Sequence, residues 1–134
     1  MIYMLDTNIC IYILNKQPIS YIERLTKIEL SNKLAISSIV LAELQYGVAN
    51  SISKEKNQIK LNALISKFDI LDFSANCALY YGELRADLKK QGVIIGNNDL
   101  LIASHALCEK AMLVTNNISE FSRCKGLMVE NWAN

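Results

Sequence analysis

The chain has 134 residues, of which 51% are hydrophobic and 20% charged, with fourteen Lys and Arg against thirteen Asp and Glu. This composition is too apolar for a disordered chain. A net charge of +1 argues against a protein that coats nucleic acid through bulk charge. The length predicts one domain over residues 1–134. No apolar run is long enough to span a membrane, and Asp6 interrupts the apolar start of the chain. We therefore expect a cytoplasmic protein with no membrane association and no signal peptide.

Short apolar runs without polar alternation predict five strands. In chain order these are Ile2–Leu5, Leu34–Ser37, Asp69–Phe73, Ala111–Thr115 and Leu127–Val129. Apolar residues three and four positions apart predict helices between them. These helices cover 9–15, 19–29, a segment after a Ser38 cap that ends before 50, 54–67, 75–91 after a Ser74 cap, 99–110 and 119–123.

Uninterrupted apolar strands that alternate with helices are typical of a parallel sheet covered on both faces. We therefore predict an α/β fold, a three-layer α/β/α domain with a central, mainly parallel sheet.

Cysteine spacing argues against a zinc site, because the chain has no CxxC pair and its only histidine is His105. A chain of this length also folds without disulfides. We expect buried free thiols at all four cysteines, Cys10, Cys77, Cys108 and Cys124. We expect a structural role for His105, which faces away from Asp99 on the same predicted helix.

Four acids lie close to the carboxyl ends of predicted strands. Asp6 follows the first strand, Glu43 lies early in the helix after the second, Asp99 begins the helix after the apolar 93–95 segment, and Glu120 follows the fourth strand. In an open parallel sheet, ligands bind at this edge. We therefore expect the four carboxylates to lie together.

Carboxylates at one edge repel each other and raise each other's pKa. A hard divalent cation relieves that conflict, and Mg²⁺ and Mn²⁺ prefer such oxygen ligands. A bound cation of this kind activates water and neutralises charge on a phosphodiester. Each acid taken alone also fits a plainer role: a helix cap for Asp6, a cap or turn for Asp99, and a solvated surface position for Glu43 and Glu120.

Six short motifs occur one after another along the chain, and together they carry a resemblance to a known family. They are Met4–Asn8 (MLDTN), Ala42–Gly47 (AELQYG), Gly96–Ala103 (GNNDLLIA), Val114–Asn117 (VTNN), Glu120–Arg123 (EFSR) and Glu130–Trp132 (ENW). Over essentially the whole chain this pattern resembles PIN-domain proteins, and more closely the VapC toxins of bacterial toxin–antitoxin pairs. The resemblance implies a compact α/β/α PIN fold and an endoribonuclease that depends on Mg²⁺ or Mn²⁺.

The resemblance also implies roles for individual residues. Asp6, Glu43 and Asp99 match the catalytic, metal-binding acidic triad. Many PIN domains carry an aspartate where this chain has Asn117, which offers a carbonyl oxygen but no charge. We therefore expect Glu120 to supply the fourth acid, directly or through water. Two polar residues in these motifs, Asn8 and Thr115, would orient the carboxylates as hydrogen-bond donors, with Asn117 near them.

For partners, the resemblance implies a VapB-type antitoxin whose C-terminal segment covers the acids, a homodimer, and promoter DNA contacted only through the antitoxin. The implied substrate is RNA, with tRNA and initiator tRNA in particular as the family precedent.

Arg85 and Lys89 lie four residues apart on one predicted helix. They form either a solvated face or a phosphate-contacting patch beside the site.

Other function classes remain as alternatives. The acids of a catalytically inactive PIN-like module would serve only to dock a basic antitoxin peptide. An aspartyl phosphatase of the haloacid dehalogenase type needs a second aspartate where this chain has Asn8, and a receiver domain needs an acidic pair that this chain lacks. PIN relatives that cut DNA are generally longer, with additional carboxylates and DNA-binding helices.

Overall fold

The computed structural model describes residues 1–132 and has a five-stranded sheet at its centre. All four neighbouring strand pairs are parallel, in the order β3-β2-β1-β4-β5. The strands are β1 (Ile2–Leu5), β2 (Lys33–Ser37), β3 (Asp69–Leu71), β4 (Met112–Val114) and β5 (Met128–Glu130). Tyr3 of the central strand is in register with Leu34 on one side and Met112 on the other. The carboxyl ends of β2, β1 and β4 therefore meet at one edge.

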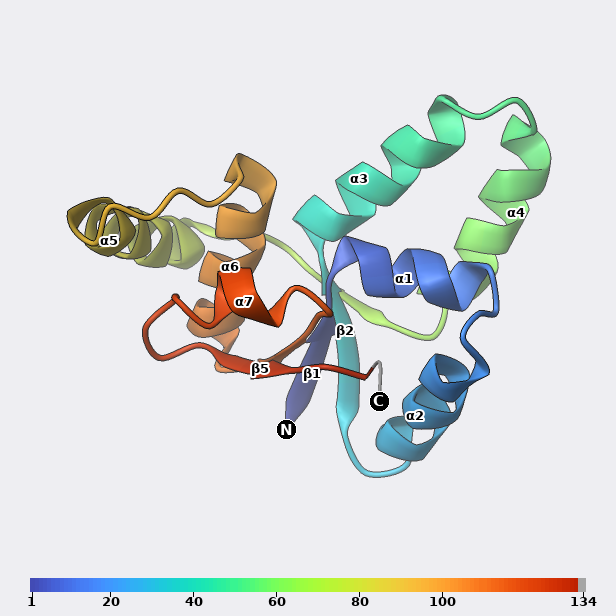
Figure 1. The fold of residues 1–134 in the computed structure, drawn as a ribbon. Coiled ribbons are helices and arrows are strands. Elements are labelled where there is room, and N and C mark those ends of the chain that lie inside the picture. The colour runs from blue at the N-terminus through green and yellow to red at the C-terminus, as the bar shows by residue number, and fades with distance from the viewer. Residues whose placement is uncertain (133–134) are drawn as a thin grey trace.

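Seven helices cover the two faces of the sheet. They are α1 (Thr7–Leu14), α2 (Ile19–Glu29), α3 (Ser38–Ala49), α4 (Lys54–Ile65), α5 (Ala75–Lys90), α6 (Asn97–Glu109) and α7 (Ile118–Phe121). Figure 1 shows α1, α2 and α4 on one side of the sheet and α5, α6 and α7 on the other. Right-handed crossovers require this arrangement, because the chain moves outward from β1 to β3 and then returns past β1 to β4. The predicted three-layer α/β/α architecture is confirmed.

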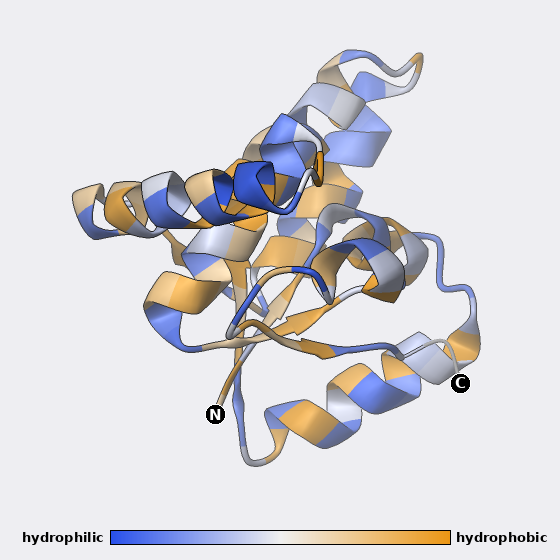
Figure 2. Cartoon of the chain, turned by 60° about the vertical axis from the view of Figure 1, so that its left-hand side comes forward, coloured by the Kyte–Doolittle hydropathy of each residue, from blue (hydrophilic) through white to orange (hydrophobic). Residues whose placement is uncertain are grey.

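The core is formed by the two central strands and the helix faces that pack on them. Leu5, Ala35 and Ile36 are fully buried, because strands covered on both faces have no solvent side. Figure 2 shows the strands mostly in orange, hydrophobic colours, whereas the surrounding helices alternate between orange and blue. That alternation is the amphipathic pattern expected of helices with one face against a sheet.

Several predicted boundaries were wrong by a few residues. The first helix begins at Thr7 rather than residue 9, and Asp6 is its N-cap. Ser37, not Ser38, caps α3, because its hydroxyl accepts a hydrogen bond from the Ile39 N–H at 3.0 Å. β3 and β4 are shorter than predicted by two residues each, and β5 begins and ends one residue later than predicted.

The prediction for the cysteines is confirmed in part. All four cysteines are free thiols, but Cys108 is only partly buried, contrary to prediction. Within residues 1–132, no helix is long and apolar enough to cross a membrane.

Candidate functional site

Asp6 lies at the end of the central strand, with only 6% of its surface exposed. Its carboxylate caps α1 by accepting a hydrogen bond from the Ile9 N–H at 3.0 Å. Burial raises the pKa of Asp6, and the charge of Glu43 raises it further, whereas hydrogen bonds from Thr115 and Ile9 oppose that rise. An acid in this position is held rigidly, and its negative charge lacks full solvation.

Thr115 connects the end of β4 to Asp6. It is fully buried, and its hydroxyl hydrogen-bonds to the Asp6 carboxylate. The same oxygen accepts a hydrogen bond from the Asn117 N–H at 3.0 Å. An ionised carboxylate can only accept hydrogen bonds, so the Thr115 hydroxyl proton points to Asp6 and fixes the orientation of the carboxylate. The predicted contact between Thr115 and an acid is thus present in the structure.

Glu43 reaches the same edge from α3. Its Oε1 accepts a hydrogen bond from Thr7 Oγ1 at 2.5 Å, which ties the second turn of α3 to the start of α1. Sequence reasoning singled out Asn8 and missed Thr7. Among the described residues Asn8 is exposed and has no side-chain hydrogen bond. The available signal was the position of Thr7 directly after the Asp6 cap.

Asp99 and Glu120 complete the group from the opposite helical layer. Burial, then the charges of Glu120, Asp6 and Glu43, raise the pKa of Asp99 to about 6. A hydrogen bond between the Asp99 and Glu120 side chains adds to this rise, because one of the two carboxyls must carry the proton. Asn117 Nδ2 donates to Glu120 Oε2 at 2.6 Å. Asn117 therefore positions the fourth acid through its amide N–H.

The structure thus brings together all four predicted acids at the carboxyl edge of the sheet. The four acids do not form one tight cluster: among residues 1–132, the one set of three His, Cys, Asp or Glu ligand atoms that all lie within 4.8 Å of one another is elsewhere. The group offers only oxygen ligands and carries excess negative charge, and three of its four members are half-buried. A hard divalent cation fits this donor set.

The substitution Thr115→Val is expected to lower any activity of this site by about 10- to 100-fold, because the hydroxyl that orients the Asp6 carboxylate is lost. It should also destabilise the fold by roughly 1–3 kcal/mol, because the Asn117 N–H loses its acceptor. Steady-state rates and urea unfolding measure the two effects. Ser104→Ala is the control, because it removes another buried hydroxyl, one that donates to the Leu100 carbonyl at 2.7 Å. Equal activity loss in both variants would contradict a specific role for Thr115.

The two predicted substrate-binding cations lie apart from these acids, on α5. Arg85 Nη1 donates to Tyr81 Oη on the same helix at 3.0 Å, and its guanidinium lies 5.9 Å from that ring. Lys89 is exposed one turn later. Within the described residues, neither cation forms an ion pair with the acids. Their contact with a substrate stays a prediction.

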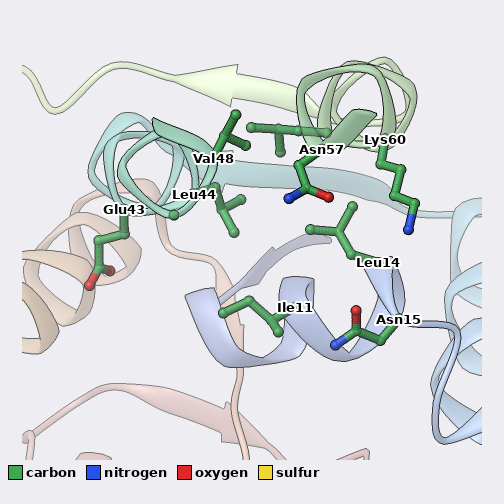
Figure 3. A pocket seen from close by; sticks show the side chains of 10 residues that line it. Ile11, Leu14, Asn15, Glu43, Leu44, Val48, Asn57 and Lys60 are labelled. Atoms are coloured by element: carbon green, nitrogen blue, oxygen red, sulfur yellow. The ribbon is translucent and has the colours of Figure 1, made fainter. Parts of the chain in front are cut away.

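A pocket of about 220 Å³ begins beside Glu43 and runs between α1, α3 and α4. Figure 3 shows Glu43 at one end and Lys60 at the other, with Ile11, Leu14 and Leu44 between them. The pocket therefore joins an apolar trough to the acidic edge. Sequence periodicity did not reveal it, because its walls come from two separate parts of the chain, α1 on one side and the consecutive helices α3 and α4 on the other.

Comparisons with known proteins identify this arrangement. Residues 3–127 match the PIN domain. The chain is 62% identical to ribonuclease VapC2 of Rickettsia felis over 98% of both chains. It is 40% identical to the tRNA(fMet)-specific endonuclease VapC of Shigella flexneri, again over 98% of both. The crystal structure of Rickettsia felis VapBC2 bound to a promoter DNA fragment contains a chain with a TM-score of 0.95 and 61% identity, covering 98% of this chain and 99% of that one. The chain therefore belongs to the PIN-domain family and, within it, to the VapC ribonucleases.

Proposed function

We propose that this chain is the toxin of a toxin–antitoxin pair and hydrolyses phosphodiester bonds in RNA with Mg²⁺ or Mn²⁺. In this proposal the ion is held by the acids described above, Asp6, Glu43, Asp99 and Glu120. One observation carries the proposal: these carboxylates raise the pKa of Asp99 to about 6 by burial and mutual repulsion. Such a site is unfavourable when empty and favourable with a divalent cation in place.

The residues divide the work at this edge. A bound divalent cation supplies an activated water and neutralises charge on the scissile phosphate. Asp6, held by its cap and by Thr115, provides the most rigid carboxylate. Glu43 is oriented by Thr7 and Glu120 by Asn117, so each glutamate has its own hydrogen-bond donor. These donors keep the carboxylates in place and so reduce the reorganisation that ion and phosphate binding require.

The proposed substrate is a tRNA, cut in its anticodon loop, and initiator tRNA is the first candidate. The name of the Shigella flexneri relative, a tRNA(fMet)-specific endonuclease, supports this choice. An enzyme that acts on tRNA works in the cytoplasm. Arg85 and Lys89 are proposed to contact RNA phosphates along α5, because both side chains are exposed and free of acidic partners in the described residues.

The proposed inhibitor is a VapB-type antitoxin that lays its C-terminal segment over the acids. The pocket beside Glu43 supports this, since an apolar segment would fill its centre while a basic side chain reached the carboxylates. Relatives have been crystallised as VapBC assemblies, among them the Rickettsia felis complex on promoter DNA. We accordingly propose that this chain forms homodimers and meets its operator DNA only through the antitoxin.

Cleavage of total bacterial RNA by the purified, antitoxin-free chain tests the proposal. With Mg²⁺ or Mn²⁺, mapping of new 5′ ends should give discrete cuts in one tRNA loop. EDTA should abolish them, and restored Mg²⁺ should return them. Asp99→Asn protein, purified in the same way, controls for a contaminating nuclease.

Each other outcome has a definite meaning. No cleavage by a folded, metal-loaded chain that still binds antitoxin would favour the catalytically inactive docking module. Cuts that survive Asp99→Asn would mean that the site lies elsewhere or that the activity belongs to a contaminant.

A further inference from the structure

A second group of potential metal ligands lies between α5 and α6, outside the carboxylate site. Cys77 Sγ from α5, and a ring nitrogen of His105 and a carboxylate oxygen of Glu109 from α6, all lie within 4.8 Å of one another. Cys77 and His105 are fully buried and Glu109 is half-buried. The cysteine spacing argued against zinc, but packing of α5 on α6 supplies a ligand combination that no short motif contains.

His105 Nε2 is a buried nitrogen that lacks a hydrogen-bond partner among the described residues. The nearest carboxylate oxygen, Glu109 Oε1, is 4.0 Å away, too far for a hydrogen bond. On the other side of the ring, Nδ1 lies 2.7 Å from Ser37 Oγ. With the Nδ1 proton donated to Ser37, Nε2 keeps a free lone pair on the side of the ring near Glu109. Histidines bound to metals are held in this way, by a hydrogen bond from the opposite ring nitrogen.

The surroundings of His105 favour the neutral imidazole that binds metals. Burial lowers its pKa, although the charges of Glu109 and Asp72 oppose that shift. The Phe73 ring packs edge-on against it, with ring centroids 5.6 Å apart. The imidazole is therefore oriented, shielded from water and uncharged at neutral pH.

Cys108 lies beside this group, although its sulfur is not among the three mutually close ligand atoms of the described residues. Its thiol is hydrogen-bonded to that of Cys77. It follows His105 by three residues and precedes Glu109, so all three lie on one face of α6. With the Cys108 side chain turned toward the ion, two sulfurs, one imidazole nitrogen and one carboxylate oxygen would supply the four donors that zinc takes in structural sites.

We infer that Cys77, His105, Cys108 and Glu109 form a binding site for a zinc-class divalent cation. Thiolates and imidazole select such a cation over Mg²⁺, which prefers the oxygen ligands of the carboxylate site. Binding would displace the thiol protons to solvent. It would also link α5 to α6, the helix that carries Asp99, and through Ser37 to the end of β2. The bound ion would therefore stabilise the layer of the fold that supports one side of the carboxylate site.

Titration of the metal-free, reduced, full-length chain with Co²⁺ and then Zn²⁺ tests this inference. Excess Mg²⁺ is present throughout to occupy the carboxylate site. We expect one Co²⁺ per chain with thiolate-to-cobalt charge-transfer absorption, its displacement by Zn²⁺, and a thermal midpoint higher by several degrees. Cys108→Ser, at a half-buried position that tolerates the change, should weaken binding at least about tenfold, and Glu109→Gln should weaken it as well.

Two control variants separate this site from the rest of the protein. Cys124→Ser, which alters a buried thiol outside the group, should bind the metal as the parent chain does. Asp99→Asn should also leave the charge-transfer band intact. The inference is overturned if no charge-transfer band forms, or if the band persists in both Cys77→Ser and Cys108→Ser. Loss of cobalt binding in Asp99→Asn alone would overturn it as well, because the ion would then occupy the carboxylates.

Discussion

Asparagine in place of Asp6 is expected to lower RNA cleavage by about a thousandfold while leaving the metal-free protein more stable than the parent chain. The loss follows from removing a charged ligand whose contribution to the transition state is several kcal/mol. The gain in stability follows from burial, which together with the charge of Glu43 raises the pKa of Asp6. Asparagine removes that charge and still caps α1, since its side-chain oxygen can accept from the Ile9 N–H.

Three measurements check this prediction together: single-turnover cleavage of the mapped tRNA, thermal unfolding in EDTA, and thermal unfolding with Mg²⁺. The parent chain should gain stability from Mg²⁺, whereas Asp6→Asn should gain much less. Asp69→Asn is the matched control, because Asp69 is exposed on an edge strand and pairs with Lys33 at 3.4 Å. Cleavage by Asp6→Asn at the parental rate would falsify the assignment. So would a loss of stability as large as that of an ordinary buried substitution.

The fold followed from the sequence because its strands are buried on both faces. Runs such as Ile2–Leu5 and Leu34–Ser37 carry no alternation, so they specify parallel strands between helices almost without help from tertiary structure. The placement of Asp6 and Glu120 followed from the same topology, since parallel strands end at one edge, whereas Asp99 follows no strand and lies at the start of the helix that leads into β4. Segment ends were less predictable: Ser37 and Ser38 are equivalent as caps in the sequence, and only the hydrogen bond to Ile39 distinguishes them.

Contacts between distant side chains could not be predicted. The hydrogen bond from Thr7 to Glu43 depends on how α1 lies against α3, and no local pattern encodes that crossing. Asn117 was expected near the carboxylates, with Glu120 as the fourth acid, but the contact it makes was not foreseen: its amide donates to Glu120. Likewise, Cys77 and His105 approach each other only through the packing of α5 on α6. The Thr7–Glu43 and Cys77–His105 pairs each join two elements whose relative position is fixed by the whole core, whereas Asn117 and Glu120 lie three residues apart at the start of α7.

Metal-free protein is expected to lose stability as pH rises from about 4 to about 6, and the loss should be traceable to Asp99. Its pKa rises from 3.8 to about 6 on folding, so between these values the folded state binds more protons than the unfolded state. Unfolding free energy falls with pH wherever that holds, and it levels off once Asp99 is ionised in both states. His105 has a lowered pKa and so acts in the opposite direction, which makes the parent chain alone uninformative.

The informative quantity is the difference in thermal midpoint between Asp99→Asn and the parent chain, measured in EDTA across this pH range. His105 is common to both proteins, so its contribution cancels. The difference should be near zero at pH 4, where Asp99 is protonated, and should reach a few degrees in favour of the variant above pH 6, since about 1 kcal/mol corresponds to roughly 4 °C at this size. Added Mg²⁺ should reverse its sign at pH 7, because the ion replaces the proton as the partner of the carboxylates. A flat difference across pH would mean that repulsion among the acids does not act on Asp99, and the argument for a cation at this edge would then lose its electrostatic basis.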